Sequence, residues 1–448
     1  MISPGAEIML LAAASGALFW AMAVVTEYRF VPSIILLSER LRIPKDVAGA
    51  TLVAAGASSP ELFSNVIAMF ITKSDLGIGT IIGSEIFNHM MILAGVCASR
   101  TTPQRLDRLT TIRDNGAYAA ALGLLLAAVA DVRRHGYADD DGRDDNSMVV
   151  VHAWSPCPLL LLYVAYAYAC SASGRSLLAK VVGANAVAAS DDKEAAVAEE
   201  EAVVALLVKE DESPAGAHVV EAYGAASAVV EADERLFAVP ELSDATPRGV
   251  LRFLVDVALA PAAWLMDATL AAPGRDATLW RLAANGGACT VWLVGLSYGM
   301  VVALERVGAL IGVSAAVVGI TVGAAGTSFP NLVSSMVAAR DGHANMAVSN
   351  ALGSNTFNLC ICLGLPWLLY PFVYGEPYEA LHDYSVVVDV ALLAFVLAVY
   401  VGVLVAYDYT LHAFMGYVFG LTWVAFLACS ILLGREIDVV ENHVQGGN

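Results

Sequence analysis

The sequence predicts an all-α polytopic membrane protein, with about ten transmembrane helices in a five-plus-five inverted repeat and broken helices at the midplane. Three observations predict this fold. The chain is 58% hydrophobic and only 15% charged, its apolar runs recur at membrane-spanning length, and two segments 270 positions apart match each other without a gap. A soluble protein of 448 residues would need more polar surface, so a membrane location follows from composition alone.

Hydropathy indicates the candidate spans, each near the length of about 20 residues that a bilayer core requires. In the first half they are 6–28, 46–71, 76–98, 112–131 and 149–171. In the second half they are 284–304, 310–338, 344–372, 385–407 and 410–434. We therefore expect a first membrane half over 1–171, a second over 284–434, and a C-terminal tail over 435–448.

A hydrophilic segment, 172–283, separates the two halves, and its stretch from Ser190 to Asp244 holds most of the net charge of −19. Between Ser190 and Asp244 it carries fifteen acidic and three basic residues with few aromatics, which predicts a partly disordered acidic loop. Apolar residues return at helical spacing from Arg248 to Trp264 and predict a helix on the membrane surface. The acidic balance excludes nucleic acid as a partner.

Lysine and arginine residues in the short loops predict the orientation in the membrane. They gather at 29–45, after the first span, and at 100–113, after the third. Both clusters fall on the same side as the long acidic segment. We therefore expect that side, and the long loop with it, to be cytosolic.

The two matched segments are 49–97 and 319–367. The constant offset pairs Ser58 with Ser328 and Pro60 with Pro330. Shared composition alone does not hold one register over nearly fifty residues. Each half has five predicted spans, and this odd number reverses the second copy in the membrane, which produces the inverted architecture of many secondary transporters.

Each copy has Gly, Ser and Pro residues in the middle of a span, where they interrupt helical hydrogen bonding. Interrupted backbone inside a membrane is tolerated only where it faces protein or a watery cavity, and its carbonyl groups are ligands suited to Na⁺ and Ca²⁺. Glu61, directly after Pro60, is a carboxylate within a span, and such a residue marks a functional site by default.

Polar oxygen-bearing residues at helical spacing form the candidate ligand set of both copies. In the first copy they are Ser58, Glu61, Ser84, Glu85 and Asn88. In the second copy they are Ser328, Asn331, Ser354, Asn355 and Asn358. No His or Cys stands at metal-ligand spacing here, which argues against zinc or copper.

At these residues the sequence resembles the cation/Ca²⁺ exchanger superfamily, specifically its K⁺-dependent Na⁺/Ca²⁺ exchanger branch. Val47 to Phe70 and Gly79 to Asn88 look like the first alpha repeat of that branch, and Ala324 to Asn358 looks like the second. The resemblance implies ten helices and electrogenic exchange of Ca²⁺ for several Na⁺, with K⁺ carried alongside Ca²⁺. By position it also adds Thr327 to the ligand set.

Three residues depart from the pattern of that branch. Asn331 and Asn358 stand where the branch has aspartates, the second of which supports K⁺ binding, and Glu85 stands where the branch has a small residue. One carboxylate has in effect moved from the second repeat to the first. K⁺ dependence and stoichiometry are therefore left open, as is the role of Glu85, which either restores the divalent site or couples H⁺.

These features predict a secondary active antiporter, not an enzyme, that exchanges Ca²⁺ for Na⁺ by alternating access and contributes to Ca²⁺ homeostasis. The first and sixth spans are expected to slide across the core, with Gly295 and Gly299 allowing close contact. We expect no cofactor, the lipid bilayer as environment, and the plasma membrane in preference to an organelle membrane.

Two alternative functions stay open at this point. Glu85 and the two asparagine substitutions favour a Ca²⁺/H⁺ or other cation/H⁺ exchanger of an organelle membrane. The acidic loop favours a membrane Ca²⁺ sensor that does not transport.

Overall fold

The structure is a computed structural model of the chain. It describes residues 3–43, 48–99, 102–129, 149–151, 154–171, 247–274, 276–340, 344–376, 378–380 and 383–445, together with 173–174, 176–178, 180 and 342. Side chains are described for most of these residues. The expected acidic loop between Ser190 and Asp244 lies outside the described residues.

The first half is built of α-helical pieces joined by π-helical turns, which are labelled η. In chain order they are α1 (Pro4–Val25), η1 (Thr26–Phe30), α2 (Val31–Arg40), η2 (Gly49–Val53), α4 (Ala54–Ala57), α5 (Ser59–Ile67), η3 (Ala68–Thr72), α6 (Leu76–Phe87), η4 (Asn88–Ile92), α7 (Leu93–Ser99), α8 (Arg108–Val129) and α9 (Cys157–Cys170). The first three form one helix, so the first span is longer than the predicted 6–28.

The second half follows the same plan after a connecting helix, α13 (Pro247–Thr269), which covers the predicted surface helix. Its elements are α14 (Leu279–Ile311), α15 (Ala315–Val318), η5 (Gly319–Gly323), α16 (Ala324–Arg340), α17 (Ala344–Phe357), η6 (Asn358–Leu363), α18 (Gly364–Tyr374), α19 (Asp383–Ala406) and α20 (Ala413–Gln445). The last helix continues through most of the predicted tail.

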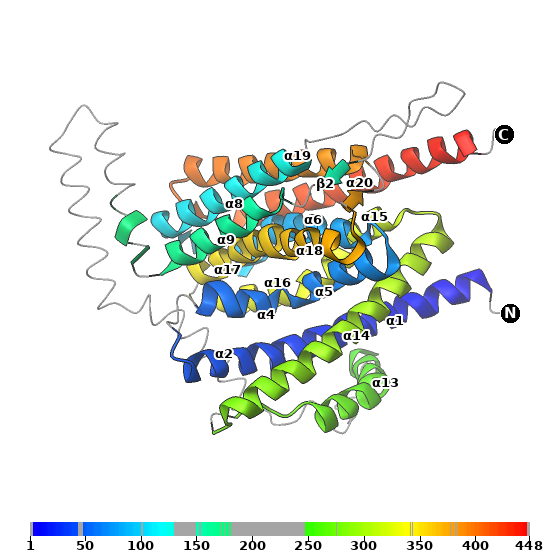
Figure 1. Cartoon of the computed structure of the whole chain (residues 1–448), viewed down its shortest axis with the longest axis horizontal. Helices are drawn as coiled ribbons and strands as arrows, with labels where there is room; N and C mark the ends of the chain where they lie inside the picture. Colours follow the sequence, from blue (N-terminus) through cyan, green and yellow to red (C-terminus); the bar gives the residue numbers. More distant parts are fainter. Residues whose placement is uncertain are drawn as a thin grey trace.

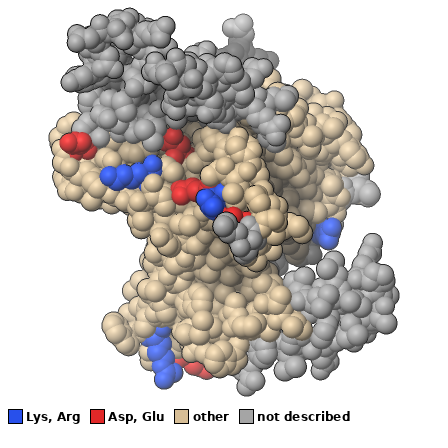
Figure 2. Space-filling model, turned by 90° about the vertical axis from the view of Figure 1, so that its right-hand side faces the viewer, with Lys and Arg blue, Asp and Glu red and all other residues tan. Residues whose placement is uncertain are grey.

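Six helical stretches in the described part of the chain are long and apolar enough to cross a membrane. They are Pro4–Arg40, Leu76–Ser99, Leu279–Ile311, Ala315–Arg340, Ala347–Tyr374 and Ala413–Ser430. The end-on view in Figure 2 shows only scattered charged side chains on a mainly uncharged face. The prediction of a helical multi-pass membrane protein is therefore confirmed, whereas the count of ten spans stays a prediction.

The helices form two unequal layers (Figure 1). Helices α1, α2, α14 and α13 lie along one side, and the remaining helices form the larger body, which contains both repeats. Helix α1 packs mainly on α14. A Cβ atom at Gly299 of α14 would lie 3.5 Å from the Leu18 side chain of α1, an ordinary van der Waals distance, and one at Gly295 would have no described atom within 4 Å. Gly299 therefore faces α1 and Gly295 does not, and neither is required by a close approach of the two helices.

Two short strand pairs join loops from the two halves. Strand β1 (Gln104–Arg105) pairs antiparallel with β4 (Thr410–Leu411), and β2 (Val149–Val151) pairs antiparallel with β3 (Tyr378–Ala380). The loops after the third and ninth predicted spans are thus neighbours. The start of the predicted fifth span, 149–171, is a strand beside the loop after the eighth span, and helix α9 begins only at Cys157. An even number of predicted spans separates the loops of each pair, as loops on one membrane side require.

Two π-helical turns of the first copy, η2 and η4, have counterparts at the matching positions of the second copy. Turn η2 begins at Gly49 and η5 begins at Gly319, while η4 begins at Asn88 and η6 begins at Asn358. Both pairs are separated by the 270 positions that align the two segments. Such wide turns interrupt helical hydrogen bonding and are frequent at functional sites. The repeat is therefore a repeat of backbone geometry as well as of residue type.

Glycines allow the two repeats to cross closely. A Cβ atom at Gly83 of α6 would lie 2.3 Å from the carbonyl oxygen of Ile320, and one at Gly319 would lie 2.4 Å from the carbonyl oxygen of Leu76. Any larger residue at these positions would separate α6 from η5. This crossing brings the polar residues that follow on α6 and α16 into contact.

Candidate functional site

The first copy breaks at Ser58, between α4 and α5. Its backbone angles, φ −93° and ψ 13°, lie in the bridge region, and Pro60 follows in the first turn of α5. Helix α5 therefore begins inside the protein, and Glu61 stands in its first turn, where a negative charge is favoured. The Glu61 side chain is only 1% exposed.

The second copy differs at the matching position. Helix α16 runs without a break through Pro330, because the fixed φ of proline is itself compatible with a helix. Carbonyl groups at the break of the first copy keep protein donors, because the Ser58 carbonyl accepts from the Leu62 N–H at 3.1 Å and the Gly56 carbonyl accepts from the Ser59 hydroxyl at 2.7 Å. The expected freeing of carbonyl groups is therefore not seen there. The interruption of the second copy lies instead in the π-helical turn η5.

Glu61 and its hydroxyl neighbours form one cluster, at the meeting of α5, α6 and α16. The Ser328 hydroxyl donates to Glu61 Oε1 at 3.5 Å, and the hydroxyl oxygens of Ser84 and Thr327 lie 3.3 Å apart. Ser58 and Ser84 are buried beside them. The structure thus brings together residues from both copies that the sequence assigned to one site.

Glu85, Asn88 and Asn355 form the second cluster. The Asn88 amide donates to Asn355 Oδ1 at 2.8 Å, and the Asn355 amide donates to the Glu85 carbonyl oxygen at 3.2 Å. Asn355 also contacts His89 Nδ1 at 2.6 Å. The histidine ring packs against Tyr118 of α8, with ring centroids 4.7 Å apart. His89, which the sequence analysis did not include, therefore helps to hold Asn355.

The remaining candidates divide into two groups. Asn358, at the start of η6, is 1% exposed, and its Oδ1 accepts from the Cys362 thiol at 3.4 Å. Ser354 is buried one helical turn earlier. Asn331, by contrast, lines a pocket between α1 and the two repeats. All eleven predicted residues thus lie in the interior, and both Asn331 and Thr327 line the pocket beside α1.

Several buried oxygen atoms of the two clusters have no hydrogen-bond partner in the described part of the protein. They are Ser58 Oγ, Glu61 Oε2, Asn88 Oδ1 and both carboxylate oxygens of Glu85. Leaving such atoms unpaired costs about 1–3 kcal/mol each, and more when they are charged. The charges of Glu61 and Glu85 also repel each other. This set of inward-facing oxygens suits hard cations such as Na⁺ and Ca²⁺.

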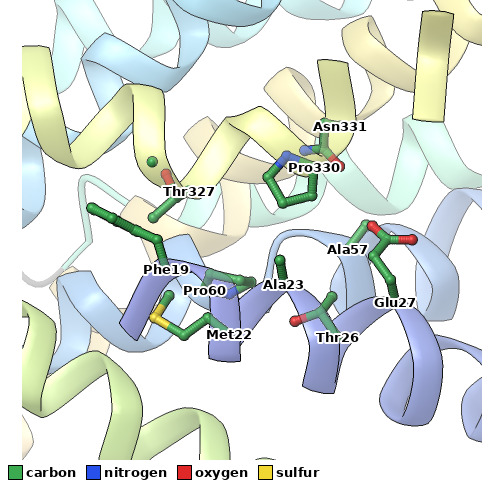
Figure 3. Close-up of a pocket in the computed structure, with 11 residues that line it drawn as sticks. Phe19, Met22, Ala23, Thr26, Glu27, Ala57, Pro60, Thr327, Pro330 and Asn331 are labelled. Carbon is green, nitrogen blue, oxygen red and sulfur yellow. The ribbon is translucent and has the colours of Figure 1, made fainter. Parts of the chain in front are cut away.

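The pocket next to Asn331 contains two polar residues that the sequence analysis missed (Figure 3). Thr26 and Glu27 project into it from the π-helical turn η1. Figure 3 shows the Glu27 carboxylate next to Ala57, with the Asn331 side chain above both residues. The signal was present in the sequence, because Glu27 is a carboxylate inside the predicted span 6–28. Glu27 lies outside the two matched segments, so the repeat does not single it out.

A family model described as sodium/calcium exchanger protein matches residues 11–172 and 286–432, which correspond to the two predicted membrane halves. The chain is 27% identical to sodium/potassium/calcium exchanger 2 of Gallus gallus, over 94% of this chain and 76% of that protein. It is 27% identical to sodium/potassium/calcium exchanger 3 of Homo sapiens, over 84% of this chain and 73% of that protein. These similarities confirm the resemblance drawn from the repeats.

Solved structures are similar at lower identity. The crystal structure of the H⁺/Ca²⁺ exchanger CAX superposes with a TM-score of 0.54 at 12% identity, over 98% of this chain and 90% of that chain. A structure of the sodium-calcium exchanger NCX_Mj gives a TM-score of 0.47 at 16% identity, over 94% of this chain and 98% of that chain. The similarity to CAX shows that the fold is shared.

Proposed function

Because the chain belongs to the sodium/calcium exchanger protein family, we propose that it is a secondary active antiporter that exchanges Ca²⁺ for Na⁺ across a membrane. One observation carries the proposal. Two carboxylates, Glu61 and Glu85, are buried among hydroxyl and amide oxygens from both repeats, and their outer oxygens lack protein partners within the described residues. Buried charge of this kind is stable only when a cation or a proton neutralises it.

The cations bind to the eleven predicted residues, which comprise the two clusters together with Asn331, Ser354 and Asn358. Glu61 is the central ligand, assisted by the hydroxyl groups of Ser58 and Ser328. Glu85 supplies the second negative charge, with Asn88 and Asn358 as neutral ligands. Two carboxylates attract a divalent ion more strongly than they attract a single monovalent ion. One Ca²⁺ and several Na⁺ can therefore compete for the same set of oxygen ligands.

Transport follows from alternating access to this shared site. The layer of α1 and α14 moves across the body that holds the two membrane halves, 1–171 and 284–434. The packing of α1 on α14 keeps these two helices together as they move. The loop over 172–283 lies in the cytosol, and the plasma membrane is the expected location.

Flux in vesicles tests the proposal. Proteoliposomes that hold the purified chain and internal Na⁺ take up radioactive calcium when external Na⁺ is removed, and Glu61→Gln abolishes this uptake. Glu39→Gln is the matched control, because it makes the same change of charge on α2 at an exposed position outside the site. Uptake that persists unchanged in Glu61→Gln contradicts the site.

Exchange of Ca²⁺ for H⁺ is the second candidate, and one observation favours it. Both carboxylate oxygens of Glu85 lack a partner among the described residues, and a proton can neutralise that carboxylate as a cation can. The same vesicles distinguish the two functions. A Na⁺ gradient without a pH gradient drives uptake by a Na⁺/Ca²⁺ exchanger, and a pH gradient without Na⁺ drives uptake by a Ca²⁺/H⁺ exchanger.

A further inference from the structure

The pocket in Figure 3 lies where the two repeats meet. It is lined by equivalent residues from each copy, Ala57 with Thr327 and Pro60 with Pro330, and its open side is covered by the helix that contains η1. Asn331, the repeat partner of Glu61, completes the lining. The pocket is therefore placed on the approximate symmetry axis between the two copies.

The long first helix is held against both copies by glycine contacts on either side of this pocket. The ring of Phe19 lies 2.3 Å from the position of a Cβ atom at Gly326, so it fills the space that a side chain would occupy. The side chains of Val31 and Ile34 lie 3.1 Å from the same position at Gly56. Gly56 and Gly326 are themselves repeat partners. Glu27 lies between these two contacts, so its position over the axis is fixed.

The polar groups that η1 presents to the pocket lack protein partners. Thr26 is 3% exposed, and its buried hydroxyl makes no hydrogen bond to any residue that the structure describes. Glu27 is half-buried, and none of the hydrogen bonds or ion pairs found among the described residues involves its carboxylate. The nearby Arg29 pairs with Asp267 of α13 at 2.7 Å.

The charge of Glu27 matters because Asn331, on the other side of the pocket, is uncharged. Asn331 occupies the position equivalent to Glu61, so the second copy contributes an amide at the point where the first contributes a carboxylate. Glu27 restores a negative charge to that side of the pocket. Because an amide oxygen and a carboxylate from different helices face one pocket, both can hold the same cation.

We propose that Glu27, with the hydroxyl of Thr26, is a cation ligand supplied by the moving helix, and that it substitutes for the carboxylate that the second repeat lacks. This inference rests on the proposed function and extends its ligand set beyond the two repeats. A bound Ca²⁺ would connect the α1 layer to the larger body. Cation binding would then favour the arrangement in which the two layers are closed over the site.

Equilibrium binding of Ca²⁺ to the purified full chain in lipid nanodiscs tests this ligand without requiring transport. Removing one carboxylate from a Ca²⁺ site is expected to weaken binding on the order of tenfold in Glu27→Gln. Glu39→Gln, which removes a charge from the same helix outside the pocket, should bind Ca²⁺ as the unchanged protein does. Affinity in Glu27→Gln equal to that of the unchanged protein would overturn the inference.

A second variant separates a ligand from a residue with a purely structural role. Adding Asn331→Asp to Glu27→Gln returns one carboxylate to the pocket from the opposite side, and it should restore Ca²⁺ affinity. A loss of affinity that Asn331→Asp does not restore would also overturn the inference. Glu61→Gln keeps this result distinct from the proposed function. If Glu61→Gln abolishes binding while Glu27→Gln does not affect it, only the inference fails, and if neither variant changes binding, the proposed site itself fails.

Discussion

The amide of Asn355 donates a hydrogen bond of 3.2 Å to the backbone carbonyl oxygen of Glu85. These two residues occupy equivalent positions in the two repeats, 270 positions apart. The second halves of the repeats therefore meet at their own matching residues, as expected where a symmetry axis passes between two copies. The backbone of Glu85 is therefore held by a side chain of the second copy, while its carboxylate oxygens have no hydrogen-bond partner among the described residues.

Asn355→Ala should disrupt the second cluster. Its side chain contacts Asn88, His89 and the Glu85 carbonyl, and removing it leaves buried polar groups unpaired at a cost of about 1–3 kcal/mol. We expect a lower unfolding temperature and loss of Na⁺-driven Ca²⁺ uptake. Thr422→Ala, which removes an exposed hydroxyl from α20, is the control. Uptake unchanged in Asn355→Ala would contradict this account of the cluster.

Gly83→Ala should separate the two repeats. The added methyl group would lie 2.3 Å from the Ile320 carbonyl oxygen, and overpacking of this kind costs about 1–3 kcal/mol. The expected result is a lower unfolding temperature together with weaker Ca²⁺ binding, because Ser84 and Thr327 move apart. Gly420→Ala on α20, where nothing lies within 4 Å, should leave both measurements unchanged. Equal unfolding temperatures of the two variants would show that α6 and η5 do not pack closely at Gly83.

Asn358→Asp should make Ca²⁺ transport respond to K⁺. Asn358 stands where the K⁺-dependent branch has an aspartate, and the substitution adds a charge beside Asn355 and Glu85 in a buried site. Uptake of radioactive calcium is measured with and without K⁺ on both sides of the membrane. Asn358→Ala, which removes the amide without adding charge, should gain no response. A response to K⁺ already present in the unchanged protein would show that Asn358 suffices for K⁺ binding.

The ion pair between Arg29 and Asp267 should couple α13 to the long first helix. Arg29 is 2% exposed, and removing one partner of a buried ion pair costs about 3–5 kcal/mol. Arg29→Gln and Asp267→Asn should each lower the unfolding temperature. The double variant should lose less stability than the sum of the losses in the two single variants. Additive losses would mean that the two residues act independently.

Sequence reasoning succeeded wherever the information is local or repeated. The in-frame match of two segments predicted the inverted plan, and the π-helical turns recur with the same offset. Carboxylates are rare in a membrane span, so the positions of Glu61 and Glu85 alone predict a site there, and the structure places both side chains in the interior. By contrast, the spacing of Pro330 predicted a break in α16 that the helix does not show.

By itself, the sequence determined the membrane class, the family and the eleven inward-facing residues, because hydropathy, repeat register and intramembrane charge are properties of single segments. Only the tertiary structure decided which oxygens meet, such as Ser328 with Glu61 and Asn88 with Asn355. It alone revealed Glu27, since the pocket is formed by α1 together with both repeats. The physical reason is that a cation site depends on oxygen atoms within ångströms of one another, and contacts between distant helices set those distances.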